Sequence, residues 1–565
     1  MSLFIRGPLA RVCILVFFVV VVVLTVSSLR HPLDGPASGP GTVPEAHDRP
    51  AGDIKYAVPE DPSQHAAPDT SAPDTSQHGS GSSLPPAPPA DTSDDEAEDS
   101  SSNGLEPCIS YSSYARQVHE PLSEGKFALA YQRPPPHCRT FNSTLAEAEL
   151  ARVKPLIADA DLARVFENTF PNTLDTAIKW RGAAANNSDE ELAFVITGDI
   201  DAMWLRDSAD QLQAYRSLVA SRDDELAALF RGAINLQARY LVLEPYCNAF
   251  QAPPEAGLGT SVGSAGSTVR PPIDTSIVST CNFELDSFAA FLQLSSDYFA
   301  ATGDLAFFGK FQWVYAVQSL LSAARNMTAP TYDDDGKRLA PPYTFNSNTR
   351  TMTATLNNVG TGNPVRRTGM VRSPFRPSDD AAVFEFLVPA NMMFETQLNG
   401  TAVIMEELGE VEVAAEMREL ARGIRAGIEE FAVVEGPAGK KIYAYEVDGF
   451  GGRNLMDDAN IPSLLSAPFI GFLDREDEVY KDTRDFVLGE HNPWFAKGPV
   501  ISAVGSPHIK PGFAWPMASI MRILTSGDDT EIEQVLGELV SSTGGLGLMH
   551  ESVNSYQETD WTREW

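Results

Sequence analysis

The sequence predicts a mainly α-helical protein whose globular part is an (α/α)6 toroid, and two observations lead to this prediction. Downstream of residue 107, about a dozen segments carry apolar residues at helical spacing, as Leu226, Phe230 and Ile234 do. Polar and proline-rich loops separate these segments, which suits alternating inner and outer helices. An irregular helical solenoid is the alternative, but no short repeat supports it. In a toroid, the loops at one end of the inner helices converge on a central pocket.

The N-terminus predicts a membrane anchor. Residues 12–29 carry no charge and are just long enough to cross a bilayer. Basic residues before this segment predict that residues 1–11 are a cytosolic tail and that the rest lies on the other side. A cleaved signal peptide is the alternative, although no A-x-A-like site follows. We therefore expect a type II single-pass protein of the Golgi or cell surface, or a secreted protein if the segment is removed.

Residues 30–106 predict a disordered stalk. They consist mostly of Pro, Ser, Asp, Gly and Ala, with almost no large apolar side chains. Such a segment cannot bury enough surface to offset its ordering entropy. We expect it to hold a catalytic domain of residues 107–565 away from the membrane.

The net charge argues against one class of partner. The 565-residue chain has 42 basic and 76 acidic residues, for a formal net charge of -34. Nucleic acid requires a basic face, so we expect no nucleic-acid partner. The charge fits a soluble extracytoplasmic domain, and no feature indicates the oligomeric state. Glycosylation sequons at Asn142, Asn186, Asn326 and Asn399 agree with a location in the secretory pathway.

Four cysteines lie beyond the apolar segment, and an oxidising lumen favours disulfides between them. Three pairings are open. Proximity in the sequence favours Cys108 with Cys138 and Cys247 with Cys281. Their spacing is not that of a metal site.

The predicted helices lie within eight stretches, residues 160–178, 207–220, 223–242, 284–303, 306–326, 391–409, 411–434 and 514–527. Strand-like segments are short, such as residues 441–447. Residues 251–275 are rich in Gly, Pro and Ser and predict a mobile surface insertion.

Several loops share acidic, aromatic and small residues and stand just before or between the predicted helices. They are TGDIDAMWLRDSADQ (197–211), NFELDS (282–287), SPFRPSDDA (373–381), YEVDGFGGRNLMDDANIPS (445–463), GSPH (505–508), GLMHES (547–552) and WTREW (561–565). Acids and amides pair with sugar hydroxyls, and aromatic faces stack on sugar C–H surfaces. The loops therefore predict a carbohydrate site.

In this order, the motifs resemble those of glycoside hydrolase family 125, the metal-independent exo-α-1,6-mannosidases. The resemblance runs from about Ala160 to the C-terminus. It implies an (α/α)6 fold, an inverting mechanism without a cofactor, and mannose-containing glycans with a terminal α-1,6 linkage as substrates. It also implies a further helix after TREW.

An inverting glycosidase needs two carboxyl groups about 6.5–9.5 Å apart, one as general acid and one as general base. The resemblance places the base at Glu551, in MHES, and the acid in SDDA. Asp379 and Asp380 are adjacent there, and the sequence does not choose cleanly between them. We favour Asp380, on the expectation that Ser378 caps a helix over residues 381–387. The alternative is that both aspartates only serve a helix N-terminus.

Arg206 and Asp207 are assigned to the terminal mannose subsite. An adjacent pair of this kind can bind two neighbouring sugar hydroxyls, because arginine donates hydrogen bonds and aspartate accepts them in a fixed geometry. Asp199 and Trp204 are expected to form a supporting wall. The alternative is a buried structural ion pair. Further sugar-binding candidates are Glu284, Asp286, Arg376, Asp448, Asp457, Asp458, Asn460 and His508. Some of these are expected to brace loops, and Arg376 is an alternative orienter of the acid.

Three rival functions remain. A metal-dependent α-mannosidase needs clustered ligands, but the nine histidines show no H-x-x-H or H-x-D spacing in the core, so we expect no metal. A second alternative is an (α/α)6 glycosidase that acts on another sugar, and only the family resemblance argues against it. A catalytically inactive glycan-binding protein is disfavoured because both SDD and MHE are retained.

Overall fold

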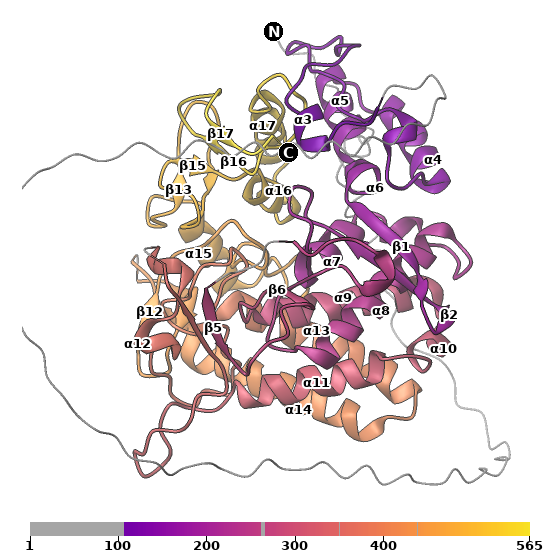
Figure 1. Ribbon diagram of the computed structural model, residues 1–565. Helices are drawn as coiled ribbons and strands as arrows, with labels where there is room; N and C mark the ends of the chain where they lie inside the picture. The colour runs from indigo at the N-terminus through magenta and orange to yellow at the C-terminus, as the bar shows by residue number, and fades with distance from the viewer. Residues whose placement is uncertain (1–106, 262–265, 350, 438, 565) are drawn as a thin grey trace, which may run out of the picture. The chain divides into compact units, whose positions relative to one another are not determined.

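The computed structural model describes residues 107–565 apart from 262–265, 350, 438 and 565 (Figure 1). The cytosolic tail, anchor and stalk expected over residues 1–11, 12–29 and 30–106 fall outside the described residues. Among the helices that are described, none is both long and apolar enough to span a bilayer.

Helices dominate the described chain, as predicted, and they form an inner and a covering set. The inner helices α7, α9 and α13 pack against one another, with α9 in contact with both of the others. Every residue of α9 from Leu285 to Ser295 is buried, as expected of a helix surrounded on all sides. The covering helix α11 instead buries a stripe that includes Trp313, Leu320 and Ala324. The helices of this part of the chain, inner and covering together, are α7 (Leu205–Gln213), α8 (Glu225–Leu243), α9 (Leu285–Thr302), α11 (Trp313–Asn326), α13 (Val388–Glu407) and α14 (Val411–Gly427).

The two ends of the described chain meet. The C-terminal helix α17 contacts α5 near the start, and Figure 1 shows the yellow and indigo segments together. This contact closes the succession of helices into a ring. The remaining helices are α3 (Tyr111–Tyr114), α4 (Thr144–Val153), α5 (Ala160–Thr169), α6 (Asn172–Thr176), α10 (Leu305–Phe308), α12 (Asn357–Gly360), α15 (Glu478–Val487), α16 (Pro516–Leu524) and α17 (Asp529–Ser541).

Three small antiparallel sheets lie where the chain enters inner helices. Strand β3 runs directly into α7, β8 runs directly into α13, and β15 ends two residues before α16 begins. The sheets are β3 (Met203–Trp204) with β4 (Ala249–Phe250) and β6 (Val278–Thr280); β8 (Phe386–Leu387) with β11 (Glu446–Val447) and β12 (Arg453–Asn454); and β15 (Phe513–Ala514) with β16 (Ser552–Asn554) and β17 (Trp561–Thr562). They place the motif loops at the N-terminal ends of these helices.

The other strands form two-stranded pairs. The hairpin of β1 (Ile178–Ala184) and β2 (Asn187–Val195) packs on α8. The others are β5 (Ser267–Arg270) with β7 (Thr344–Ser347), β9 (Val433–Glu435) with β10 (Lys441–Tyr443), and β13 (Phe495–Ala496) with β14 (Ala503–Val504). Strand β5 lies within the predicted insertion at residues 251–275, and Gln251 is buried. Part of that insertion is therefore ordered.

Each of the eight predicted helical stretches contains a helix, but residues 381–387 do not form one. They make bends and strand β8. The backbone N–H groups of Val383 and Phe384 donate to the Glu446 carboxylate at 3.2 and 3.3 Å, and Phe386 and Leu387 pair with β11 as a strand. The capping role expected for Ser378 is therefore wrong, and the preference for Asp380 loses its basis.

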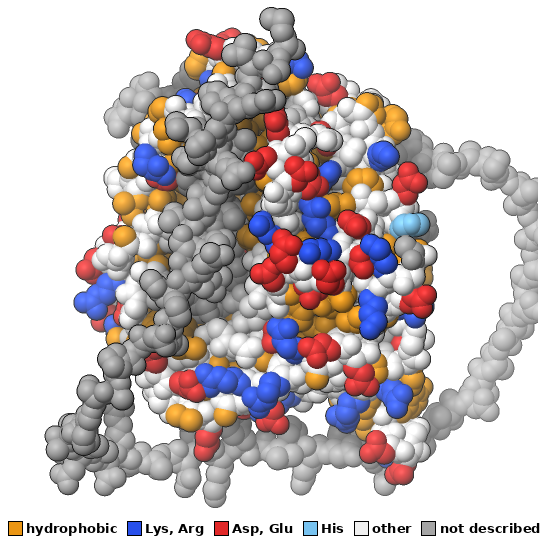
Figure 2. All heavy atoms as spheres, turned by 180° about the vertical axis from the view of Figure 1, so that it is seen from behind, with side chains coloured by type: hydrophobic (Ala, Val, Ile, Leu, Met, Phe, Trp, Pro, Cys, Tyr) orange, Lys and Arg blue, Asp and Glu red, His pale blue; other side chains and the backbone are white. Residues whose placement is uncertain are grey.

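Both favoured disulfides are confirmed, Cys108–Cys138 and Cys247–Cys281. On the face shown in Figure 2, basic and acidic side chains are interspersed. The described residues of that face form no continuous basic surface of the kind that nucleic acid requires.

Candidate active site

Arg206, in the first turn of α7, joins three of the predicted motifs. Its Nε donates to Asp286 Oδ2 at 2.9 Å, and its Nη1 lies 3.1 Å from Asp207 Oδ2. A further guanidinium N–H donates to the Pro377 carbonyl at 2.5 Å, in the SDD loop. The guanidinium is buried, so much of its donor capacity serves to hold α7, α9 and this loop together. Asp207 is more open, with 29% of its side chain exposed.

The carboxyl groups around Arg206 are crowded and buried. Burial raises the pKa of Asp286 to about 6 and that of Asp210 to about 7, although the Arg206 charge lowers both. Burial also raises the pKa of Glu284 well above its ordinary value, and the nearby Asp379 charge adds to the effect. Glu284 and Asp286 each keep one carboxyl oxygen without a hydrogen-bond partner among the described residues. The start of α9 therefore holds protonatable groups at neutral pH.

Asp379 is half-buried and sits in the left-handed backbone region, at φ 63°. A non-glycine residue there is strained, and such strain concentrates at functional sites. Its Oδ1 accepts hydrogen bonds from the side-chain amides of Asn248, at 2.9 Å, and Asn282, at 3.0 Å. The Asn248 amide also donates to Glu284 Oε1 at 3.0 Å. Asp379 thus belongs to a network of amides and a buried carboxyl group.

Asp380 has different partners. Its side chain is buried, and its Oδ2 accepts from the Ser378 hydroxyl at 3.0 Å. The same oxygen lies 3.4 Å from His508 Nδ1, in GSPH. Hydrogen bonding to Asp380 raises the pKa of His508, and the charges of Asp380 and Glu551 raise it further. His508 is therefore the residue on which SDD, GSPH and MHES converge.

Glu551 lies directly before β16, with 19% of its side chain exposed. Its Oε2 is 3.8 Å from Arg563 Nε, and Arg563 Nη1 is 3.4 Å from Asp199. WTREW therefore links GDID to MHES through Arg563, a residue not singled out by the sequence analysis. The neighbouring His550 makes structural contacts: its Nδ1 bonds the Arg563 carbonyl at 2.9 Å, and its ring stacks on Trp561.

A second buried ion pair, in addition to Arg206–Asp286, supports the SDD loop. Arg376 Nε donates to Glu446 Oε1 at 2.6 Å, and both side chains are buried. Glu446 was not predicted, because YEVDG offers several acids and only the fold selects this one. Asp458 accepts from the Asn460 backbone N–H at 3.0 Å and from the Ser506 hydroxyl at 3.2 Å. These contacts join MDDAN to GSPH.

Two candidates use their carboxylates to hold turns. Asp448 Oδ1 accepts the backbone N–H groups of Phe450 and Gly452 at 2.7 and 2.9 Å. Asp457 accepts the N–H groups of Leu464 and Leu465 at 2.8 and 3.0 Å. Burial raises the pKa of Asp457 to about 7. Both residues match the loop-bracing role that was expected of some candidates.

Trp204 is buried beside Ala202 and Ala249, and its indole N–H has no hydrogen-bond partner in the described part of the chain. Within the described residues, one group of His, Cys, Asp and Glu places its ligand atoms within 4.8 Å of one another, at Cys108, His137 and Cys138. The two cysteines form a disulfide, so this group offers no thiolate ligands.

Residues 159–565 match the family model of the metal-independent α-mannosidases, GH125. The chain belongs to glycoside hydrolase family 125. It is 43% identical over 461 residues to the meiotically up-regulated gene 157 protein of Schizosaccharomyces pombe, covering 81% of this chain and 89% of that one.

A solved structure agrees with the family assignment. It is a Streptococcus pneumoniae metal-independent α-mannosidase in a non-productive complex with α-1,6-mannobiose. The similarity is 33% identity with a TM-score of 0.65, over 74% of this chain and 93% of that one. The protein is thus a family 125 glycoside hydrolase, a metal-independent α-mannosidase with the predicted (α/α)6 fold.

Proposed function

We propose that the protein is an exo-acting, inverting α-mannosidase that removes terminal α-1,6-linked mannose. One observation carries the mechanism: SDD and MHES, far apart in the chain, meet at His508, whose Nδ1 lies 3.4 Å from Asp380 Oδ2 and whose pKa is raised by hydrogen bonding to Asp380 and by the charges of Asp380 and Glu551. Two carboxyl groups on either side of one sugar are what an inverting glycosidase requires. The α-1,6-mannobiose held by the Streptococcus pneumoniae relative supports the linkage.

In this proposal Asp379 is the general acid. It is more open than Asp380, and its Oδ1 is fixed by two amides, which leaves Oδ2 to face the leaving oxygen. It also lies beside Glu284, and its charge adds to the effect of burial in raising the pKa of that carboxyl group. Asp380 already serves Ser378 and His508 as an acceptor. We assign it to the sugar hydroxyls instead.

Glu551 is the general base in this proposal. Its Oε2 lies 3.8 Å from the Arg563 guanidinium, and in this role it takes a proton from the attacking water. The water attacks the anomeric carbon while Asp379 protonates the departing glycosidic oxygen, so the product is β-mannose. Asp207, Asp380 and His508 would hold the mannose hydroxyls, and Arg206 would fix the loops that carry these groups.

We further propose that the enzyme works in the secretory pathway, in the Golgi or at the cell surface, on mannose-containing glycans. Residues 12–29 and 30–106 support this proposal through their sequence alone, as anchor and stalk. The four sequons and the two disulfides fit the same oxidising compartment.

One assay tests the reaction. The enzyme is incubated with α-1,6-mannobiose, with and without EDTA, and the released sugar is followed by NMR. We expect β-mannose to appear first, at equal rates in both samples. Release of α-mannose would refute inversion, and the absence of turnover would favour a glycan-binding protein.

A second assay assigns the acid. Asp379→Asn and Asp380→Asn are compared on α-1,6-mannobiose and on α-mannosyl fluoride, whose leaving group needs no proton. The acid is the residue whose replacement stops the first reaction and spares the second. If Asp380→Asn shows this pattern and Asp379→Asn does not, the two roles are exchanged.

A further inference from the structure

The disulfide Cys247–Cys281 stands directly before two residues of the site. Asn248 follows one cysteine and Asn282 follows the other, and both side-chain amides donate to Oδ1 of Asp379. Each sulfur is therefore one residue away from an amide that holds the SDD carboxylate. The disulfide is buried, with both cysteines at 2% exposure or less.

The backbone alone gives these amides little support. Strand β4 has two residues and β6 has three, with a register shift between Ala249 and Phe250. Both strands stop short of Asn248 and Asn282, which lie beyond the paired register. The chain between them is long, since the two cysteines are 34 positions apart. The Asn248 side-chain oxygen accepts the Asn282 backbone N–H at 3.1 Å, and the disulfide adds a covalent link to this hydrogen bond.

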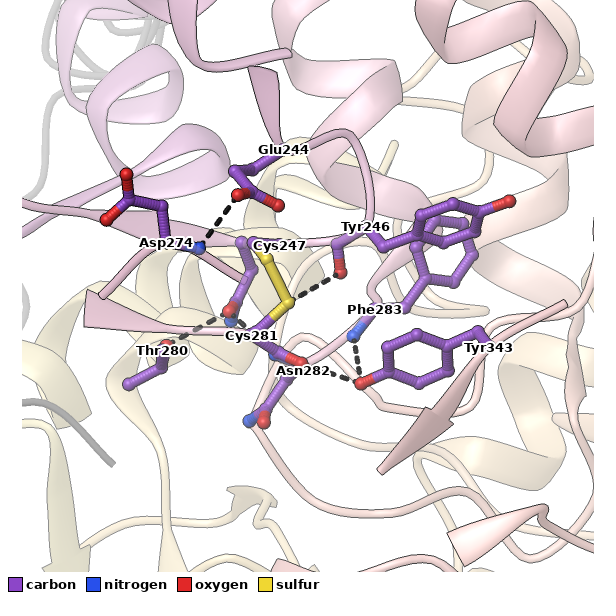
Figure 3. Close-up of a disulfide and its surroundings, with 10 residues drawn as sticks. Glu244, Tyr246, Cys247, Asp274, Thr280, Cys281, Asn282, Phe283 and Tyr343 are labelled. Carbon is purple, nitrogen blue, oxygen red and sulfur yellow. Dashed lines mark hydrogen bonds between the residues drawn. A yellow bond between two sulfur atoms is a disulfide. The ribbon is translucent and has the colours of Figure 1, made fainter. Parts of the chain in front are cut away.

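Other contacts tie the same segment to the site. The Tyr343 hydroxyl donates to the Cys281 carbonyl at 2.6 Å and accepts from the Phe283 N–H at 3.2 Å, on either side of Asn282 (Figure 3). The Asn248 carbonyl accepts the N–H of Leu205 at 3.0 Å, next to Arg206. These backbone contacts hold the chain on either side of Asn282 and at Asn248.

The SDD loop needs such support. Asp379 has a left-handed backbone at φ 63°, a conformation that persists only where the surroundings hold it. Two amides on one oxygen fix the rotation of the carboxyl group and so the direction of the other oxygen. Misplacing a catalytic group by about 1 Å can cost about 100-fold in rate.

We infer that the Cys247–Cys281 disulfide, acting through Asn248 and Asn282, is a positioning device for the Asp379 carboxyl group. The inference rests on the proposed function, in which Asp379 protonates the leaving oxygen. It makes the disulfide part of the enzyme's proton-delivery geometry as well as of its stability. The asparagines are positioning residues, since they act through Asp379.

The chain offers a matched control for the test, because its second disulfide, Cys108–Cys138, has no contact with the SDD loop in the described residues. The double variants Cys247→Ala/Cys281→Ala and Cys108→Ala/Cys138→Ala are compared on α-1,6-mannobiose and α-mannosyl fluoride. We expect the first to lose kcat on mannobiose by about 10- to 100-fold, with KM and the fluoride reaction within about threefold of wild type. The control should keep both reactions, although each variant loses thermal stability.

Asn282→Ala provides a second test in which the disulfide stays intact, in case the cysteine variant fails to fold. We expect the same split between substrates, with a loss of about 10-fold on mannobiose. Equal loss on both substrates, or no loss relative to the control, would overturn the inference.

Asp379→Asn separates this inference from the proposed function. If that variant is inactive on mannobiose while the cysteine and Asn282 variants are unaffected, the acid assignment stands and the positioning role fails. If Asp379→Asn hydrolyses mannobiose normally, the acid assignment fails and the positioning role fails with it.

Discussion

Asp379 is surrounded by two amides and a buried carboxyl group, whereas Glu551 lies 3.8 Å from a guanidinium. On the SDD side, neutral amides fix the direction of one carboxyl oxygen, whereas on the MHES side a positive charge lies near the carboxyl group. In the proposed mechanism the two environments carry opposite tasks, proton donation on the SDD side and proton acceptance on the MHES side.

The two regions also differ in what holds them. Glu551 stands at the end of a backbone ladder, where its N–H donates to the Thr562 carbonyl at 3.2 Å and Ser552 pairs with Thr562. Asp379 lies in a strained loop held by side chains from residues far away in the sequence. We therefore expect single substitutions far away in the sequence to displace Asp379 more easily than Glu551.

The largest effect is expected on the base side. Glu551→Gln should lower kcat on α-1,6-mannobiose by about 10,000-fold, because an amide cannot take a proton from the attacking water. The melting temperature should stay near that of wild type, since the ladder is formed by the backbone. Near-normal turnover in this variant would remove Glu551 from the mechanism.

The next effect concerns the acid side. Asp379→Asn should lower kcat on α-1,6-mannobiose by about 100- to 1,000-fold while α-mannosyl fluoride is still hydrolysed. Steady-state rates on both substrates measure the contrast with Glu551→Gln, which should lose both reactions. Equal losses in the two variants would contradict the division of tasks drawn above.

Arg563→Gln tests the charge beside the base. Arg563 is 44% exposed, so solvent screens it, and we expect a loss of only about threefold to 10-fold in kcat. Steady-state rates on α-1,6-mannobiose measure this loss. An unchanged rate would mean that Arg563 only links Asp199 to the MHES strand.

The smallest effect is a pH-dependent stability, at the residue between the two regions. The pKa of His508 is raised above its unfolded value of about 6.5 by Asp380, so the contact stabilises the fold fully below that pH. The contribution is lost as the pH rises through the folded pKa. His508→Gln should therefore lower the melting temperature by about 1–2 °C at pH 5.5 and by less at pH 9. A difference that grows with pH would contradict this sign.

The helices could be predicted because their signal is local. Apolar spacing in α8 and α9 places buried residues on helical faces, whatever the rest of the chain does. The helix expected over residues 381–387 was wrong because β11, a distant strand, pairs with Phe386 and Leu387. Capping rules consider only neighbouring residues and therefore do not predict a contact with a distant segment.

Composition, spacing and motif order were enough to predict the helical class, the motif loops and the family resemblance, and proximity favoured the disulfide pairing that the structure shows. The contacts between distant side chains followed from the folded structure. Asn248 and Asn282 reach Asp379 across 131 and 97 positions, and Arg563 reaches Asp199 across 364. Such pairs are brought together by the packing of whole helices. No periodic pattern in the sequence marks them, because they form only in the folded state.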